Sequence, residues 1–147
     1  MIGPPVLPPT SASTVPGTIQ PIWTVFSGAK IPEPMDFLPQ VVDARDVADL
    51  FLYTIEHPDE ANGERYIASG AVSHPQAVAD ILRRAMPEAR ERIQEGTPGQ
   101  GYLPTYEVDE KTAVKIDSGK AKKALGRDWI ALEKSVIDTA ESFEGLV

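Results

Sequence analysis

The side chains that most often perform nucleophilic or acid–base chemistry are scarce in this sequence. It contains no cysteine, which excludes disulfides, thiolate nucleophiles and every metal site that uses cysteine. The two histidines, His57 and His74, each precede a proline at a predicted helix end, and neither is accompanied by a Gly-x-Ser-x-Gly turn or by metal-ligand spacing. We therefore expect both histidines to be surface residues, and we predict no catalytic and no metal-ligating residue in this chain.

Three clustered glycines, Gly96, Gly99 and Gly101, form the one segment that resembles a phosphate cradle. A phosphate-binding loop follows a buried strand and opens a helix, whereas this segment precedes Leu103-Pro104. The pattern favours a flexible surface loop, and a loop that covers a substrate is the functional alternative.

Two carboxylates, Asp43 and Asp46, lie where a predicted buried strand leads directly into a helix. A carboxylate at a helix N-terminus accepts backbone N–H bonds and stabilises the helix by about 1 kcal/mol. We predict that Asp46 is this N-cap, because a catalytic role would require a substrate beside it.

The chain has 147 residues, with 14 basic against 22 acidic side chains and a formal net charge of −8. This acidic balance argues against a protein that binds the phosphates of a nucleic acid. The lysines and arginines of residues 111–127 alternate with acidic residues, which is typical of a solvent-exposed face. No run approaches the roughly twenty apolar residues of a membrane-spanning helix, and residues 1–9 lack the features of a secretory signal. We expect one soluble, cytoplasmic domain at most, without nucleic-acid or membrane partners; its oligomeric state is left open.

Nine of the 14 prolines fall within the first 40 residues, which predicts loop structure there with one short helix inside residues 18–30. A buried strand is expected from Phe37-Leu38 through residues 41–44, leading into a helix that ends at Pro58. Its apolar face carries Val47, Leu50, Phe51, Thr54 and Ile55.

The second half continues with short elements. Residues 65–69 have strand composition, and Ser73 with Gln76 forms a capping-box pattern at the start of a helix that stops at Pro87. Residues 114–117 are expected to be extended, and Ser118 to cap a helix over residues 120–125 that Gly126 ends. The last helix carries its apolar face on Leu132, Val136, Ala140 and Phe143.

Several of these segments resemble, in family order, the extended short-chain dehydrogenases/reductases of the NAD-dependent epimerase/dehydratase superfamily. Residues 41–48 are similar to the family's strand running into Asp-Val-Ala, residues 2–4 to the Gly-Pro after its sixth nucleotide-domain strand, and residues 63–67 to a later strand. Residues 96–101 and 116–126 resemble the branch that contains dihydroflavonol reductases, fungal aldehyde reductases and methylglyoxal reductases.

The resemblance implies an α/β fold, namely the C-terminal substrate-binding portion of a Rossmann-type extended reductase without its N-terminal nucleotide-binding half. Family members use NADPH or NADH to reduce aldehydes and ketones to alcohols, so NADP is the implied cofactor and a small carbonyl the implied substrate. The family's Gly-x-x-Gly-x-x-Gly turn, catalytic serine and Tyr-x-x-x-Lys pair have no counterpart here. The chain is therefore expected to be a truncated reductase that is inactive alone.

The resemblance also implies which residues line the site. Residues 1–40 would be a Pro-rich pocket-lining segment and residues 41–147 an αβ substrate domain. Gly17 departs from the asparagine that relatives place there. The cofactor-binding residues would be Ile2, Pro4 and Thr18, and the substrate-pocket residues Pro16, Gln20 and Trp23.

Three alternatives stay open from the sequence. Trp23 and Phe26 have a second interpretation as core anchors of a short helix. The chain as a whole has a second interpretation as a non-catalytic binding or assembly protein derived from this fold. A third is a fragment of a nucleotide-sugar epimerase or dehydratase, which shares the Asp-Val-Ala segment.

Overall fold

A computed structural model describes residues 1–31, 40–111 and 114–147. Within these ranges, short helices surround one two-stranded sheet, and no helix is long and apolar enough to cross a membrane. The elements in chain order are η1 Ala12–Thr14, α1 Gln20–Phe26, β1 Gln40–Val41, α2 Ala44–Glu56, α3 Pro58–Ala61, β2 Ala71–Val72, α4 Pro75–Ala85, η2 Pro87–Ala89, α5 Gly119–Leu125 and α6 Leu132–Glu141.

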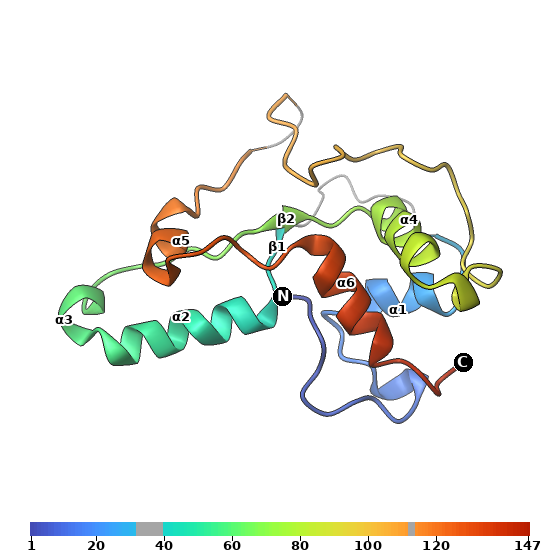
Figure 1. The fold of residues 1–147 in the computed structure, drawn as a ribbon, viewed down its shortest axis with the longest axis horizontal. Coiled ribbons are helices and arrows are strands. Elements are labelled where there is room, and N and C mark those ends of the chain that lie inside the picture. Colours follow the sequence, from blue (N-terminus) through green and yellow to red (C-terminus); the bar gives the residue numbers. More distant parts are fainter. Residues whose placement is uncertain (32–39, 112–113) are drawn as a thin grey trace.

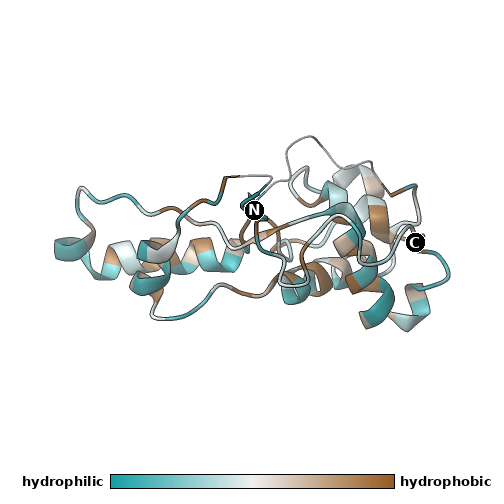
Figure 2. Ribbon diagram, turned by 90° about the horizontal axis from the view of Figure 1, so that it is seen from above, coloured by the Kyte–Doolittle hydropathy of each residue, from teal (hydrophilic) through white to brown (hydrophobic). Residues whose placement is uncertain are grey.

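The elements form two groups (Figure 1). We call α1, α4 and α6, which pack on one another, the body. We call α2, α3, α5 and residues 62–70 the arm, in which α2 packs on α3 and α5. Seen from above, the arm extends away from the body (Figure 2), and the sheet and the chain termini lie nearer the body.

An aromatic cluster fills the body. The ring of Trp23 meets that of Phe143 edge-on with centroids 5.3 Å apart, and Phe26 lies 5.8 Å from the same ring. Ile81 and Leu82 of α4 are fully buried against this cluster. The 3,4,7 spacing of apolar residues predicted a helix within residues 18–30, and α1 confirms this prediction. The helix is entered through a proline in its first turn, and it is long enough to bury the apolar side chains of one face.

The sheet joins the body to the arm. β1 pairs antiparallel with β2 in the register Gln40 to Val72 and Val41 to Ala71. Ile2, near the N-terminus, forms a parallel bridge to Asp43, which follows β1. The predicted strand leading into a helix is thus confirmed by β1 and α2, while its first part, Phe37-Leu38, lies outside the described residues.

The strand predicted over residues 65–69 does not form there. The paired strand β2 begins at Ala71, two residues after the end of the predicted strand. The Gly70 N–H donates to the Val41 carbonyl at 2.8 Å. None of the backbone N–H groups of residues 65–69 donates a hydrogen bond to another described residue. Strand composition was correctly recognised, but a strand requires a partner, and the described chain offers none beyond Val41.

Three further expectations for the second half have different outcomes. Residues 114–117 are not in a strand; the Gln40 side chain instead donates to the Val114 carbonyl and accepts from the Ile116 N–H. Gly126 ends α5 in the left-handed conformation with φ of 64°, as predicted. Ser118 precedes α5 but does not cap it, because its hydroxyl donates to the Ser69 carbonyl.

We expect Trp23→Ala to lower the free energy of unfolding of this chain by about 3–5 kcal/mol, because it leaves a cavity between α1 and Phe143. The matched variant Phe51→Ala truncates a side chain that is 66% exposed, so a change within about 0.5 kcal/mol is expected. Urea unfolding followed by circular dichroism measures both. Equal losses in the two variants would show that the aromatic cluster is not the core of the chain.

Candidate functional site

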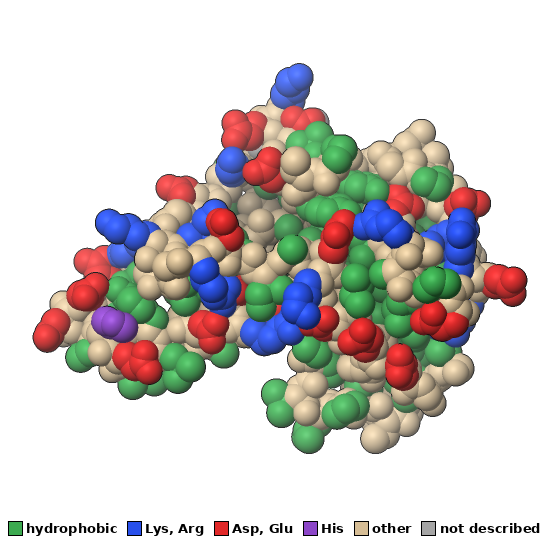
Figure 3. Space-filling view, viewed as in Figure 1, with side chains coloured by type: hydrophobic (Ala, Val, Ile, Leu, Met, Phe, Trp, Pro, Cys, Tyr) green, Lys and Arg blue, Asp and Glu red, His purple; other side chains and the backbone are tan. Residues whose placement is uncertain are grey.

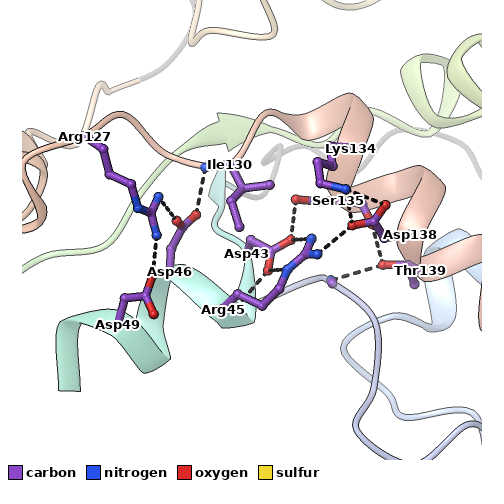
Figure 4. A network of polar contacts seen from close by, with 11 residues as sticks. Asp43, Arg45, Asp46, Asp49, Arg127, Ile130, Lys134, Ser135, Asp138 and Thr139 are labelled. Carbon is purple, nitrogen blue, oxygen red and sulfur yellow. Dashed lines mark hydrogen bonds and ion pairs between the residues drawn. The ribbon is translucent and has the colours of Figure 1, made fainter. Parts of the chain in front are cut away.

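A buried carboxylate, Asp43, lies at the centre of the polar network that joins α2 to α6 (Figure 4). Arg45 forms a bidentate pair with this carboxylate: its Nε donates to Oδ1 at 2.9 Å and its Nη2 donates to Oδ2 at 2.8 Å. The Ser135 hydroxyl of α6 donates to Oδ2 at 2.6 Å, and the Arg45 backbone N–H donates to Oδ1 at 2.9 Å. Each carboxylate oxygen therefore accepts two hydrogen bonds.

The hydrogen bonds to Asp43 determine its charge. Burial alone would raise the pKa of this carboxyl, but the hydrogen bonds from Arg45 and Ser135 outweigh burial and hold its pKa below the usual range. With all four acceptor positions filled, Asp43 has no free lone pair with which to accept a substrate proton. Asp43 is thus a structural carboxylate and the N-cap of α2, the role that the sequence assigned to Asp46.

Asp46 has a different role from the one predicted. It is fully buried in the first turn of α2, where its carboxylate accepts from Arg127 Nη1 at 2.6 Å and from the Ile130 N–H at 3.0 Å. Arg127 also donates to Asp49 at 2.6 Å. The prediction was wrong because two aspartates three residues apart both fit the N-cap pattern, and Asp43 occupies that position. Asp46 instead ties α2 to the segment between α5 and α6.

Gly3 brings the N-terminal segment against this network. Its N–H donates to the Thr139 hydroxyl at 3.1 Å. Its φ is +119°, and a Cβ atom at this position would lie 2.9 Å from Asp43 Oδ1. A side chain at residue 3 would therefore displace the Asp43 carboxylate, and the neighbouring Ile2 and Pro4 take their positions from this close approach.

The residues predicted to contact cofactor lie at two places. Ile2 is buried, with its N–H donating to Val42 and its carbonyl accepting from Ala44. Pro4 is half-buried beside it, whereas Thr18 is exposed at the entrance to α1. Ile2 and α1 do meet in one hydrophobic core.

The residues predicted to line the substrate pocket also differ in exposure. Pro16 and Gln20 are exposed at the start of α1, and Trp23 is buried in the aromatic cluster of the body. The core interpretation of Trp23 and Phe26 therefore fits the described chain, and a pocket role for either residue stays a prediction about a larger protein.

Two surface hollows occur elsewhere. One of about 410 Å³ lies between β2, α5 and Trp129, and one of about 500 Å³ lies between α4, Pro98 and Tyr102. None of the six predicted cofactor or pocket residues lines either hollow. The described residues also contain no group of three His, Asp or Glu side chains placed to hold a metal ion.

The glycine-rich loop over residues 95–102 is held by side chains of α4. Gln76, which is buried, accepts from the Thr97 N–H at 2.9 Å and donates to the Glu95 carbonyl and to Asp80. Asp80 accepts in turn from the Gly99 N–H and from the Tyr102 hydroxyl. These hydrogen bonds hold the loop in a defined conformation, whereas the sequence pattern favoured a flexible surface loop.

His74 is buried rather than on the surface, and it caps α4 in place of the predicted Ser73. Its Nδ1 accepts from the Gln76 N–H at 3.0 Å, which requires the neutral ring. Burial lowers the pKa of His74, against the smaller opposing influence of Asp80. Gly101 packs on the ring: its φ is +83°, and a Cβ there would lie 2.4 Å from Nε2.

The tyrosines with altered pKa values are poorly suited to proton transfer. The hydrogen bond to Glu60 raises the pKa of Tyr53 to about 12. Burial and acceptance by Asp80 raise the pKa of Tyr102, and burial also raises that of Tyr106, whose hydroxyl donates to Glu133. A tyrosine that acts as an acid needs its pKa lowered toward the working pH, and the pKa of each of these three tyrosines is raised instead.

No protein-family model matches the chain. In sequence, it is 27% identical over 104 residues to the GRP2 protein of Candida albicans, which is named as an NADPH-dependent methylglyoxal reductase; the match covers 71% of this chain and 29% of that protein. An uncharacterized oxidoreductase of Saccharomyces cerevisiae is 31% identical over 99 residues, covering 67% of this chain and 27% of that protein.

Solved structures give a fuller match. The structure of the yeast methylglyoxal/isovaleraldehyde reductase Gre2 complexed with NADPH has a TM-score of 0.73 and 28% identity, covering 97% of this chain and 42% of that one. Gre2 from Candida albicans has a TM-score of 0.70 and 26% identity, with coverage of 96% and 40%. The chain thus spans well under half the length of the relatives that it matches.

Asp43→Asn should lower the free energy of unfolding at neutral pH by about 2–3 kcal/mol, because an amide cannot accept all the bonds from Arg45 and Ser135. The pKa of Asp43 is lowered from 3.8, so its stabilisation is complete above about pH 4 and is lost as the pH falls through the folded-state value. Urea titrations from neutral to acidic pH measure this. Glu91→Gln, at an exposed position, is the control; parallel stability profiles for the two variants would contradict the assignment.

His74→Asn should remove one component of acid destabilisation. The pKa of His74 is lowered from 6.5, so its contribution is present above about pH 6.5 and is lost as the pH falls toward the folded-state value. Asparagine caps a helix without titrating, so we expect the variant to lose less stability than the parent between pH 7 and pH 5. Thermal melts across this range test it, with the exposed His57→Asn as the comparison; an identical change in both variants would refute the buried cap.

Proposed function

We propose that this chain, which has the sequence and fold of the C-terminal part of an extended short-chain dehydrogenase/reductase, forms the substrate-pocket wall of an NADPH-dependent enzyme that reduces small aldehydes or ketones to alcohols. The observation that carries the proposal is the structural match to a reductase complexed with NADPH along nearly the whole of this chain. The proposal includes a small dicarbonyl or aldehyde as substrate and a cytoplasmic location.

The described residues do not form a dinucleotide site by themselves. Both backbone groups of Ile2 are already hydrogen-bonded to Val42 and Ala44, and Pro4 has no N–H to offer. The glycine-rich loop is engaged by Gln76 and Asp80 and does not lead into a helix N-terminus. We therefore assign NADPH to the part of the relatives that this chain does not match, and no step of hydride transfer to residues of this chain.

The role left to this chain is to shape and close a pocket. The Asp43 network holds residues 2–4 at one fixed position beside α2 and α6, and the α4 side chains hold residues 95–102 in a defined loop. Rigid supports of this kind suit residues that orient a substrate. Exposed Pro16 and Gln20 at the start of α1 then contribute side chains to the pocket wall, and exposed Thr18 between them is the residue proposed to contact the cofactor.

Joining this chain to the N-terminal part of Candida albicans Gre2 that it does not match should give NADPH-dependent reduction of methylglyoxal, measured as loss of NADPH absorbance. Gln20→Ala should change the ratio of kcat/KM for a bulky and a small carbonyl by about 1–3 kcal/mol in activation free energy, because a pocket residue acts differently on the two substrates. Lys123→Ala, at an exposed position of α5, should leave the ratio unchanged.

The 147-residue chain alone is the second control for this experiment. We expect its affinity for NADPH to be weaker than about 10 μM, measured by titration calorimetry. Tight saturable binding by the chain alone would overturn the assignment of the cofactor to the other part. A folded fusion that binds NADPH but reduces no carbonyl would overturn the proposed activity.

A further inference from the structure

Three arginines line the surface hollow beside the C-terminal half of α4. This hollow has a volume of about 500 Å³, and its lining includes Asp80, Arg83, Arg84, Arg90, Pro98 and Tyr102. We call it the arginine hollow. Basic side chains gather over α4 and the turn that follows it (Figure 3). Because the whole chain carries a net charge of −8, three guanidinium groups around one hollow reverse the sign of the charge locally.

The fold holds two of these arginines in place. Arg83, whose side chain is 18% exposed, donates through Nη1 to the Arg90 and Ile93 carbonyls at 2.7 and 2.6 Å. Arg84 donates to Glu133 of α6 at 2.5 Å. Both lie in the last turn of α4, where a positive charge also complements the helix dipole. Their guanidinium groups are therefore fixed at the hollow, and an anion that binds there has little side-chain ordering to impose on them.

Arg90 has no comparable structural role. It follows η2 at an exposed position, and its side chain forms no hydrogen bond or ion pair with any other residue that the structure describes. Its backbone, in contrast, is fixed by the hydrogen bond from Arg83. A guanidinium group offers five N–H donors in a planar fork that suits the oxygens of phosphate or carboxylate. Arg90 is thus the arginine of the hollow that is available to a ligand.

Two acidic side chains beside the hollow oppose an anion only weakly. Asp80 accepts from the Gly99 N–H and from the Tyr102 hydroxyl, at 2.8 and 2.7 Å, so hydrogen bonds from the glycine-rich loop offset its charge. Glu95 lies 3.6 Å from Arg83 Nη2, which is longer than a hydrogen bond, and its side chain is 63% exposed. Exposed ion pairs of this kind contribute little free energy, so an incoming anion can replace Glu95 at low cost.

We propose that the arginine hollow binds a small phosphate monoester, with the phosphate held by the arginines and the organic part against Pro98 and Tyr102. A phosphate dianion matches several guanidinium groups better than a single carboxylate does. The Tyr102 ring stacks on the Tyr106 ring with centroids 5.6 Å apart, which gives the hollow a firm apolar side. The volume lies within the range of small-molecule sites.

This site is additional to the proposed function, since none of the residues predicted to contact cofactor or carbonyl substrate lines the hollow.

Titration of phenyl phosphate into the ¹⁵N-labelled 147-residue chain tests the proposal, with inorganic phosphate and benzoate as further probes. We expect saturable shifts of the amide signals within residues 80–102. The affinity for phenyl phosphate should exceed that for inorganic phosphate at least about threefold, because the ring buries apolar surface. It should also exceed the affinity for benzoate, which carries a single negative charge.

Two double variants with the same loss of charge locate the site. Arg84→Gln with Arg90→Gln should weaken phenyl phosphate binding at least about tenfold. Arg65→Gln with Lys123→Gln, at exposed positions of the arm, should leave it unchanged. Arg90→Gln alone removes no contact to a described residue, so it should weaken binding while the urea midpoint of the chain stays the same. This single variant separates a loss of binding from a loss of folding.

Several results would overturn the site. These are no saturable binding, equal losses in the two double variants, or amide shifts that extend over the arm. Equal affinities for phenyl phosphate and inorganic phosphate would show attraction of anions without a ligand pocket, and benzoate binding as tight as that of phenyl phosphate would show that the site does not select phosphate; either result contradicts the proposal. None of these measurements depends on carbonyl reduction, so their failure leaves the proposed function intact.

Discussion

Burial of the ionised Asp43 carboxylate is the constraint on which the arrangement of this chain depends. A buried charge is tolerated only when every acceptor position is filled, and here Arg45 and Ser135 fill them from two elements. Gly3 approaches the same carboxylate so closely that no side chain fits between them. The start of α2, the middle of α6 and the N-terminal segment are consequently positioned by one group: Arg45 and Ser135 by hydrogen bonds to it, and Gly3 by close packing on it.

The helices with a clear apolar period were the elements most accessible from the sequence. Val78, Ile81 and Leu82 of α4 are buried as their spacing predicts, and so are Val136 and Ala140 of α6. Their positions follow from periodicity alone, because a single face must be removed from water. The helix starts were harder: the pairs Asp43 and Asp46, and Ser73 and His74, each offer two capping candidates, and only the path of the entering chain decides between them.

The polar networks escaped sequence reasoning, although a signal for them exists. Ser135 and Thr139 fall within the stripe formed by Leu132, Val136 and Ala140, and a hydroxyl at such a position needs a buried partner. Gln76 and Asp80 form a similar polar pair one turn apart on α4. The partners themselves, Asp43 and the loop at residues 95–102, are too distant in sequence to be inferred. The placement of Trp23 in the body shows the complementary difficulty, since one aromatic side chain suits a core and a pocket equally well in sequence.

The body and the arm are held by different forces, and solution conditions therefore act on them separately. The body relies on buried aromatic and aliphatic side chains, whose attraction weakens on cooling. The arm relies more on exposed ion pairs, including Arg127 with Asp49 and Lys122 with Asp128, and dissolved salt weakens these by screening. Low temperature thus weakens the contacts of the body more than those of the arm, and high ionic strength weakens the ion pairs of the arm more than the contacts of the body.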